Sequence, residues 1–102
     1  FTPVELLLAA IAGCSALDVE AITHKRTSST TFAVHAEGDK VRDAGGNHMT
    51  GIRVSFDVAF PEGPDGDAAR DRVEAAIAMS RDRLCTVSRT VQLGADVVYD
   101  VS

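Results

Sequence analysis

The segment that decides the fold is residues 6–22, LLLAAIAGCSALDVEAI. Thr2 and Pro3 lie just before it, and a threonine followed by a proline is a typical helix start. Basic residues 24–26 come just after it, where they suit the negative end of a helix dipole. Apolar residues occupy nearly every face of this helix. Because a helix that is apolar all round is normally buried, we expect a central helix covered by other parts of the protein.

Length and composition predict one globular domain spanning residues 1–102. Apolar residues make up 45% of the chain and charged residues 25%, values that allow one modest hydrophobic core. The net charge is −5, and no basic block is longer than the pair Lys25-Arg26. Phosphate backbones and anionic membranes require a basic surface, so neither a nucleic acid nor a membrane is an expected partner.

The rest of the chain predicts an antiparallel sheet and a second helix. Residues 32–37 and 52–60 alternate apolar and polar side chains as half-buried strands do, and the loop composition of residues 43–47 makes them a hairpin. Residues 69–84 carry apolar side chains at helical spacing, and residues 86–90 form a break or a short further helix. A last strand is expected over residues 96–101. The predicted fold class is α+β, with the sheet packed on the central helix.

Cys14 and Cys85 are the two cysteines, and their number limits what they can do. Two cysteines are too few for a disulfide-stapled secreted domain or for a cysteine-rich zinc site, so we expect no metal and no cofactor. Either both thiols are buried structural residues, or they form one redox pair. The number of cysteines alone favours structural burial, because free cysteines are among the most buried residues. Arginines near Cys85 in sequence would favour a reactive thiolate. These are Arg81, Arg83 and Arg89.

Other polar residues are weaker candidates. His24, His35 and His48 fall on a helix end, a strand and a loop edge, and no metal-ligand spacing links them. Asp18 and Glu20 are near Cys14 but two positions apart on a helix, so they do not face each other as an acid–base pair.

Two segments resemble motifs of a known family. Residues 2–14, TPVELLLAAIAGC, resemble the first cysteine motif of the OsmC/Ohr family of thiol-dependent hydroperoxide reductases, and residues 80–88, SRDRLCTVS, resemble its second. Residues 14–19, CSALDV, followed by Lys25-Arg26, are similar to a less characterised OsmC-like subgroup. The resemblance covers essentially the whole chain in matching order.

The resemblance implies both an assembly and a reaction. It implies an intertwined homodimer in which sheets wrap two central helices. It further implies reduction of an organic hydroperoxide in oxidative-stress defence, with Cys14 as the peroxidatic and Cys85 as the resolving cysteine. A dithiol reductant would then restore both thiols by exchange. If the two cysteines form such a redox pair, they should approach closely within one chain.

The chain departs from the family pattern at two points. In the characterised peroxidases a glutamate directly follows the proline of the first motif and holds an activating arginine. Here Val4 has that place, and Glu5, one position further, is a weak substitute. We also expect this chain to lack the N-terminal strands that would carry the arginine. A non-catalytic OsmC-like dimer that binds an apolar small molecule in a crevice beside Cys14 is therefore the alternative.

The expected location is the cytoplasm. Residues 11–14, IAGC, resemble a lipoprotein signal box, but no basic residue precedes the apolar run and Glu5 stands where a positive region should be. The apolar stretch 6–14 is also shorter than the roughly 20 residues of a membrane span.

Overall fold

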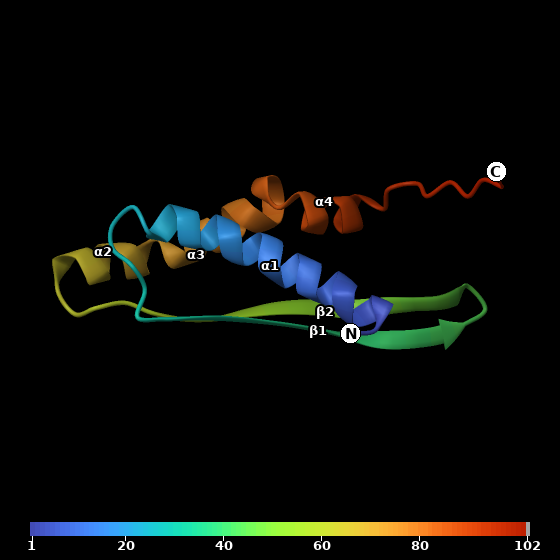
Figure 1. The fold of residues 1–102 in the computed structure, drawn as a ribbon, viewed down its shortest axis with the longest axis horizontal. Helices are drawn as coiled ribbons and strands as arrows, with labels where there is room; N and C mark the ends of the chain where they lie inside the picture. The colour runs from blue at the N-terminus through green and yellow to red at the C-terminus, as the bar shows by residue number, and fades with distance from the viewer. Residues whose placement is uncertain (102) are drawn as a thin grey trace.

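The structure is a computed structural model and describes residues 1–101. The chain consists of one long helix, a two-stranded hairpin and a run of short helices (Figure 1). In chain order these are α1 (Pro3–Thr23), β1 (Thr31–Asp43), β2 (Gly46–Ala59), α2 (Pro64–Asp71), α3 (Val73–Met79), a π-helical turn η1 (Ser80–Leu84) and α4 (Thr86–Leu93). The predicted α+β class is confirmed.

Helix α1 begins where the sequence predicts. The Thr2 hydroxyl accepts a hydrogen bond from the Glu5 N–H at 3.1 Å, and the Glu5 carboxylate accepts one from the Thr2 N–H at 2.9 Å. This reciprocal pair satisfies two backbone donors that a helix start leaves free. The buried side chains of α1 recur every fourth residue and so form one stripe, which consists of Ile11, Ser15, Val19 and Thr23.

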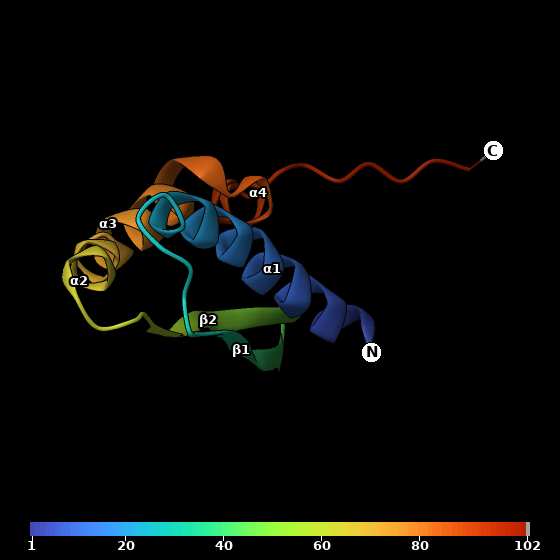
Figure 2. The same ribbon diagram turned by 60° about the vertical axis from the view of Figure 1, so that its left-hand side comes forward.

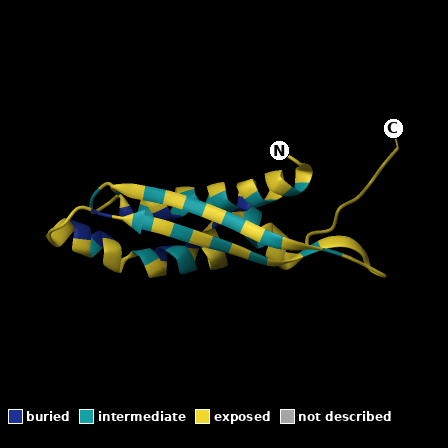
Figure 3. Cartoon of the chain, turned by 90° about the horizontal axis from the view of Figure 1, so that it is seen from below, coloured by how far each residue is buried: buried dark blue, intermediate teal, exposed yellow. Residues whose placement is uncertain are grey.

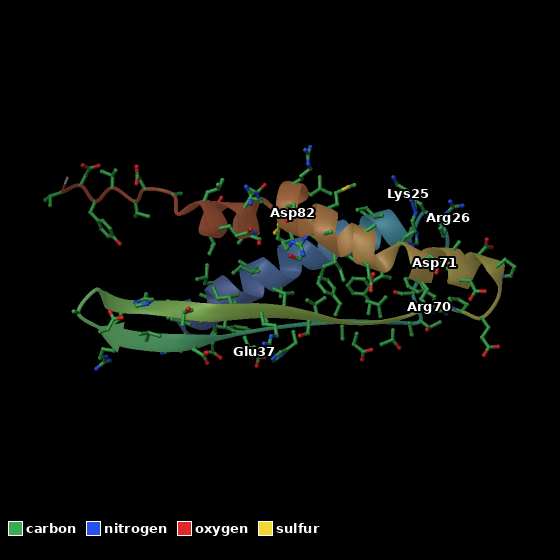
Figure 4. All side chains as sticks on the ribbon, turned by 180° about the vertical axis from the view of Figure 1, so that it is seen from behind. Lys25, Arg26, Glu37, Arg70, Asp71 and Asp82 are labelled. Atoms are coloured by element: carbon green, nitrogen blue, oxygen red, sulfur yellow. The ribbon has the colours of Figure 1, made fainter. Side chains whose placement is uncertain are left out.

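Strands β1 and β2 form the predicted antiparallel hairpin. The half-buried apolar side chains of the two strands face one another across the ladder in the pairs Phe32–Val58, Val34–Phe56 and Ala36–Val54. Figure 3 shows the resulting alternation of half-buried and exposed residues along both strands. Glu37 and Arg53, which carry opposite charges, are cross-strand neighbours at exposed positions. Figure 4 shows Glu37 on the side of the hairpin that faces away from the helices. This two-sided pattern sets the register, because a slip by one residue would expose every apolar side chain.

The helices form a layer on one face of the hairpin. Helix α1 contacts β1 and also α3, η1 and α4, so it lies between the hairpin and the C-terminal helices (Figure 2). The helix predicted over residues 69–84 is present, but it is not one continuous α-helix. It is broken at Arg72, whose N–H bonds the Ala69 carbonyl three residues back, and its last turn is π-helical.

The strand predicted over residues 96–101 is wrong. Helix α4 ends at Gly94, whose left-handed φ of 65° stops the helix, and the chain continues as an exposed tail that projects from the molecule (Figure 1). Alternating apolar residues favour an extended backbone, but a strand needs a partner edge. Within residues 1–101, β1 and β2 pair only with each other.

Helix α1 has the length and apolar composition that could cross a membrane, so the argument that its apolar stretch is too short is wrong. The folded helix has 21 residues because residues beyond Cys14 extend it. Core helices of soluble proteins have the same properties, and α1 carries Asp18 and Glu20 and packs on four other elements. In the single chain only its one stripe is buried, while Leu6 and Leu17 are 54% and 72% exposed.

Replacing Ile11 by alanine should strongly destabilise the fold. The Ile11 side chain is 3% exposed at the N-terminal end of the buried stripe, and its truncation leaves a cavity that costs about 2–5 kcal/mol. Chemical denaturation at fixed protein concentration measures the change. Glu20→Ala, at an exposed position of the same helix, is the control and should change the free energy of unfolding by less than about 0.5 kcal/mol. Equal effects of the two substitutions would contradict this packing.

Candidate functional site

Helix α1 and the π-helical turn bring the two thiols together. The Cys14 sulfur, the Cys85 sulfur and a carboxylate oxygen of Asp18 all lie within 4.8 Å of one another. Cys14 and Asp18 are neighbours on successive turns of α1, and Cys85 approaches them from the start of α4. The expectation that the two cysteines approach closely within one chain is confirmed.

The π-helical turn determines which residue reaches α1. The Cys85 N–H donates a hydrogen bond of 2.9 Å to the carbonyl of Ser80, five residues earlier. In an α-helix the donor to Ser80 would be residue 84, four residues later. As a result the Cys85 side chain is fully buried, while Leu84 is 46% exposed. Turns of this kind occur frequently at functional sites.

Three serines hold the cluster by hydrogen bonds. The Ser15 hydroxyl donates to the Cys85 sulfur at 3.7 Å, and the Ser88 N–H donates to the same sulfur at 3.4 Å. The Ser80 hydroxyl, itself buried, donates to Asp18 Oδ2 at 2.8 Å. Sequence reasoning gave these serines and Asp18 no role. The available signal was a serine next to Cys14 and serines five before and three after Cys85.

The surroundings of Cys14 favour its neutral thiol. The hydrogen bond with Cys85 has the largest effect and raises the pKa of Cys14; burial and the negative charges of Cys85 and Asp18 raise it further. A hydrogen bond from the Val87 backbone acts in the opposite direction. Cys14 is therefore less ionised than an exposed cysteine at the same pH.

The arginines near Cys85 in sequence do not offset this effect. Arg81 binds Asp82 through two hydrogen bonds of 2.8 and 3.0 Å, and Arg89 donates to Gln92. Figure 4 shows Asp82 on the outside of the helical layer. Across residues 1–101, no lysine or arginine is among the groups that shift the pKa of Cys14.

Glu5 lies apart from the thiols in this chain. It is nine positions before Cys14, about 13.5 Å along the axis of α1, and its carboxylate closes the capping box with Thr2. Those hydrogen bonds lower the pKa of Glu5. The observed contacts of Glu5 are therefore those of a helix cap.

A cavity of about 350 Å³ adjoins the cluster. Its wall is mainly apolar and comes from α1, β2, α3, η1 and α4, with Ile11, Ile52, Val54, Phe56, Ile77 and Val91 as its apolar side chains. Arg81 and Gln92 are polar members of the same wall. Ser15 and Ser88, which both hydrogen-bond Cys85, also line it. An apolar small molecule placed here would lie beside the thiols.

Comparison with known proteins gives one family. A family model described as "OsmC-like protein" matches residues 1–100. No curated protein matches the chain.

Removing Cys85 should lower the pKa of Cys14. In Cys85→Ala the hydrogen bond that contributes most to raising this pKa is lost, so Cys14 should ionise at lower pH than in the parent protein. The rate of alkylation of Cys14, followed against pH by peptide mass spectrometry, reports its ionisation. Asp18→Asn should shift the profile in the same direction by a smaller amount. A profile that stays in place or moves to higher pH in Cys85→Ala would refute the assignment.

Proposed function

The chain belongs to the OsmC-like family, and we propose that it reduces organic hydroperoxides through Cys14 and Cys85 in defence against oxidative stress. The observation that carries the proposal is the proximity of the two sulfurs, which helix α1 and the π-helical turn hold within 4.8 Å. A reaction that passes through a disulfide needs such a pair.

In the first step the Cys14 thiolate attacks the outer oxygen of the hydroperoxide. The O–O bond breaks, the alkoxide takes a proton and leaves as an alcohol, and Cys14 becomes a sulfenic acid. The Cys85 thiolate then attacks the Cys14 sulfur, a disulfide forms, and hydroxide leaves and is protonated to water. A dithiol reductant, itself oxidised to a disulfide, returns both thiols, so two electrons pass from the dithiol to the peroxide.

The cavity suits the organic part of such a substrate. Its apolar wall would bury an alkyl or aryl group by the hydrophobic effect, while Ser15 marks the end nearest the thiols. The reaction should be slow, because the groups around Cys14 favour the unreactive thiol.

Binding without catalysis is the second candidate function. The same cavity supports it, as does Val4 at the position of the family's glutamate. In that case Cys14 and Cys85 would form a polar boundary beside an apolar ligand. We place either activity in the cytoplasm, where dithiol reductants are maintained.

We further propose that residues 1–102 form one OsmC-like domain that acts as a homodimer, with α1 near the two-fold axis. The single chain exposes 7351 Å², about a third more than the roughly 5,500 Å² of a compact monomer of this mass. Its radius of gyration is 16.5 Å, against about 13 Å for a compact chain of this length. The exposed apolar side chains, which a partner would cover, include Leu6, Leu17, Val97, Val98 and Tyr99.

Peroxide consumption should depend on the two cysteines in different ways. Cys14→Ser should abolish turnover of an organic hydroperoxide in the presence of a dithiol. Cys85→Ser should oxidise once at Cys14 and then stall, giving a burst of one peroxide per chain. Full activity of Cys14→Ser, or an inactive parent protein with every hydroperoxide and dithiol tried, would favour the ligand-binding function.

The dimer should depend on the exposed side of α1. Light scattering at micromolar concentration should give twice the chain mass for the parent protein. Leu17→Glu should shift the mass toward the monomer, because it places a charge at a contact that would be buried in the dimer. Glu62→Lys, in the loop before α2, serves as the control and should remain dimeric. A stable monomeric parent protein would contradict the proposal.

A further inference from the structure

We propose that Cys14, Asp18 and Cys85 form a binding site for a thiophilic divalent cation, best matched by Zn²⁺. This inference uses the same residues as the proposed peroxide reduction, but it does not depend on that activity.

The first reason is the charge of the cluster. One carboxylate and two ionisable thiols lie within 4.8 Å of one another. Within residues 1–101, the ion pairs are made by other acids, namely Glu37 with His35, Asp67 with Arg70, and Asp82 with Arg81. Asp18 instead receives a hydrogen bond from the neutral hydroxyl of Ser80. With both thiols deprotonated, the three groups would repel one another; a cation would offset that repulsion, and a divalent ion does so most fully.

The second reason is the kind and spacing of the donor atoms. Zn²⁺ binds thiolate sulfur at about 2.3 Å and carboxylate oxygen at about 2.0–2.2 Å, and a tetrahedral site therefore needs sulfurs about 3.8 Å apart. The donor atoms of the cluster lie within 4.8 Å, so small side-chain rotations bring them to this spacing. Calcium and magnesium, which prefer all-oxygen sites, do not fit two sulfurs.

The third reason is how the backbone supports the ligands. Cys14 and Asp18 are four positions apart on α1, a spacing that places two metal ligands on one helix face. The π-helical turn adds Cys85 from a second element. Ser80 donates to Asp18 at 2.8 Å, and such outer hydrogen bonds orient metal ligands. Three protein ligands leave a fourth position open to water.

Binding would release the two thiol protons and hold both sulfurs on the metal. No electrons are transferred, so the ion would protect the thiols from oxidation without changing their redox state. Removal of the ion would return the free dithiol pair. The metal-bound and peroxide-reactive forms of the site are thus mutually exclusive.

The test is a Zn²⁺ titration of the reduced protein, under a phosphine reductant and without peroxide, in competition with a chromogenic chelator. The parent protein should bind one Zn²⁺ per chain. Cys14→Ser, Cys85→Ser and Asp18→Asn should each weaken binding at least about tenfold, and Ser80→Ala by about 10–100-fold. Asp71→Asn, an exposed substitution on α2 away from the site (Figure 4), is the matched control and should bind as the parent does. Circular dichroism verifies that each variant is folded.

Three results would overturn the proposal: no binding by the parent protein, one Zn²⁺ shared by two chains, or parental affinity in folded Asp18→Asn. Peroxide turnover is measured separately, in the presence of a chelator. Loss of the metal site would therefore leave the peroxide reaction standing, and an inactive protein that binds Zn²⁺ would leave the metal site standing.

Discussion

The hydrogen bond from the Cys85 N–H to the Ser80 carbonyl is the interaction on which the site depends. If the Leu84 N–H bonded the Ser80 carbonyl instead, the α-helix would continue and Leu84 would face α1. The Cys85 thiol would then be turned about 100° away. The five-residue bond is rarer and less favourable in a helix, so surrounding contacts must stabilise it. Burial of Cys85 and the Ser80–Asp18 hydrogen bond supply those contacts. The turn and the cluster therefore support one another, and neither is expected alone.

Sequence patterns predicted the structure correctly wherever the conformation of an element depends on its own residues. The helix start at Thr2 and Pro3 and the hairpin with its two-sided strands follow from local patterns, and both are confirmed. The same reasoning failed where structure depends on a second element. The tail after Gly94 has the pattern of a strand but no edge to pair with in this chain. The π-helical turn has no periodic signature, so the exposure of Leu84 could not be predicted.

The candidate site was likewise predicted in part: its thiols could be predicted, but the contacts between elements could not. Its two thiols could be identified from motifs, and their proximity was predicted from the chemistry that the resemblance implies. Asp18 was set aside because it was compared with Glu20 along α1, whereas its partner, Ser80, lies on another element. The site differs from an activated thiol site in its charge. The Asp18 carboxylate lies near Cys14 and helps to raise the pKa of its thiol, whereas stabilising a thiolate requires a nearby cation. A metal ion or a residue of a second subunit could each supply that charge.

The proposed peroxide reduction requires Cys14 and Cys85 to form one reversible redox pair. Mass spectrometry of the non-reduced protein, after one equivalent of an organic hydroperoxide, tests this most directly. A disulfide joining Cys14 to Cys85 of the same chain, lighter than the reduced protein by two hydrogens and fully reversed by a dithiol, is the predicted result. Over-oxidation of Cys14 with Cys85 still free, or a disulfide joining two chains, would contradict it.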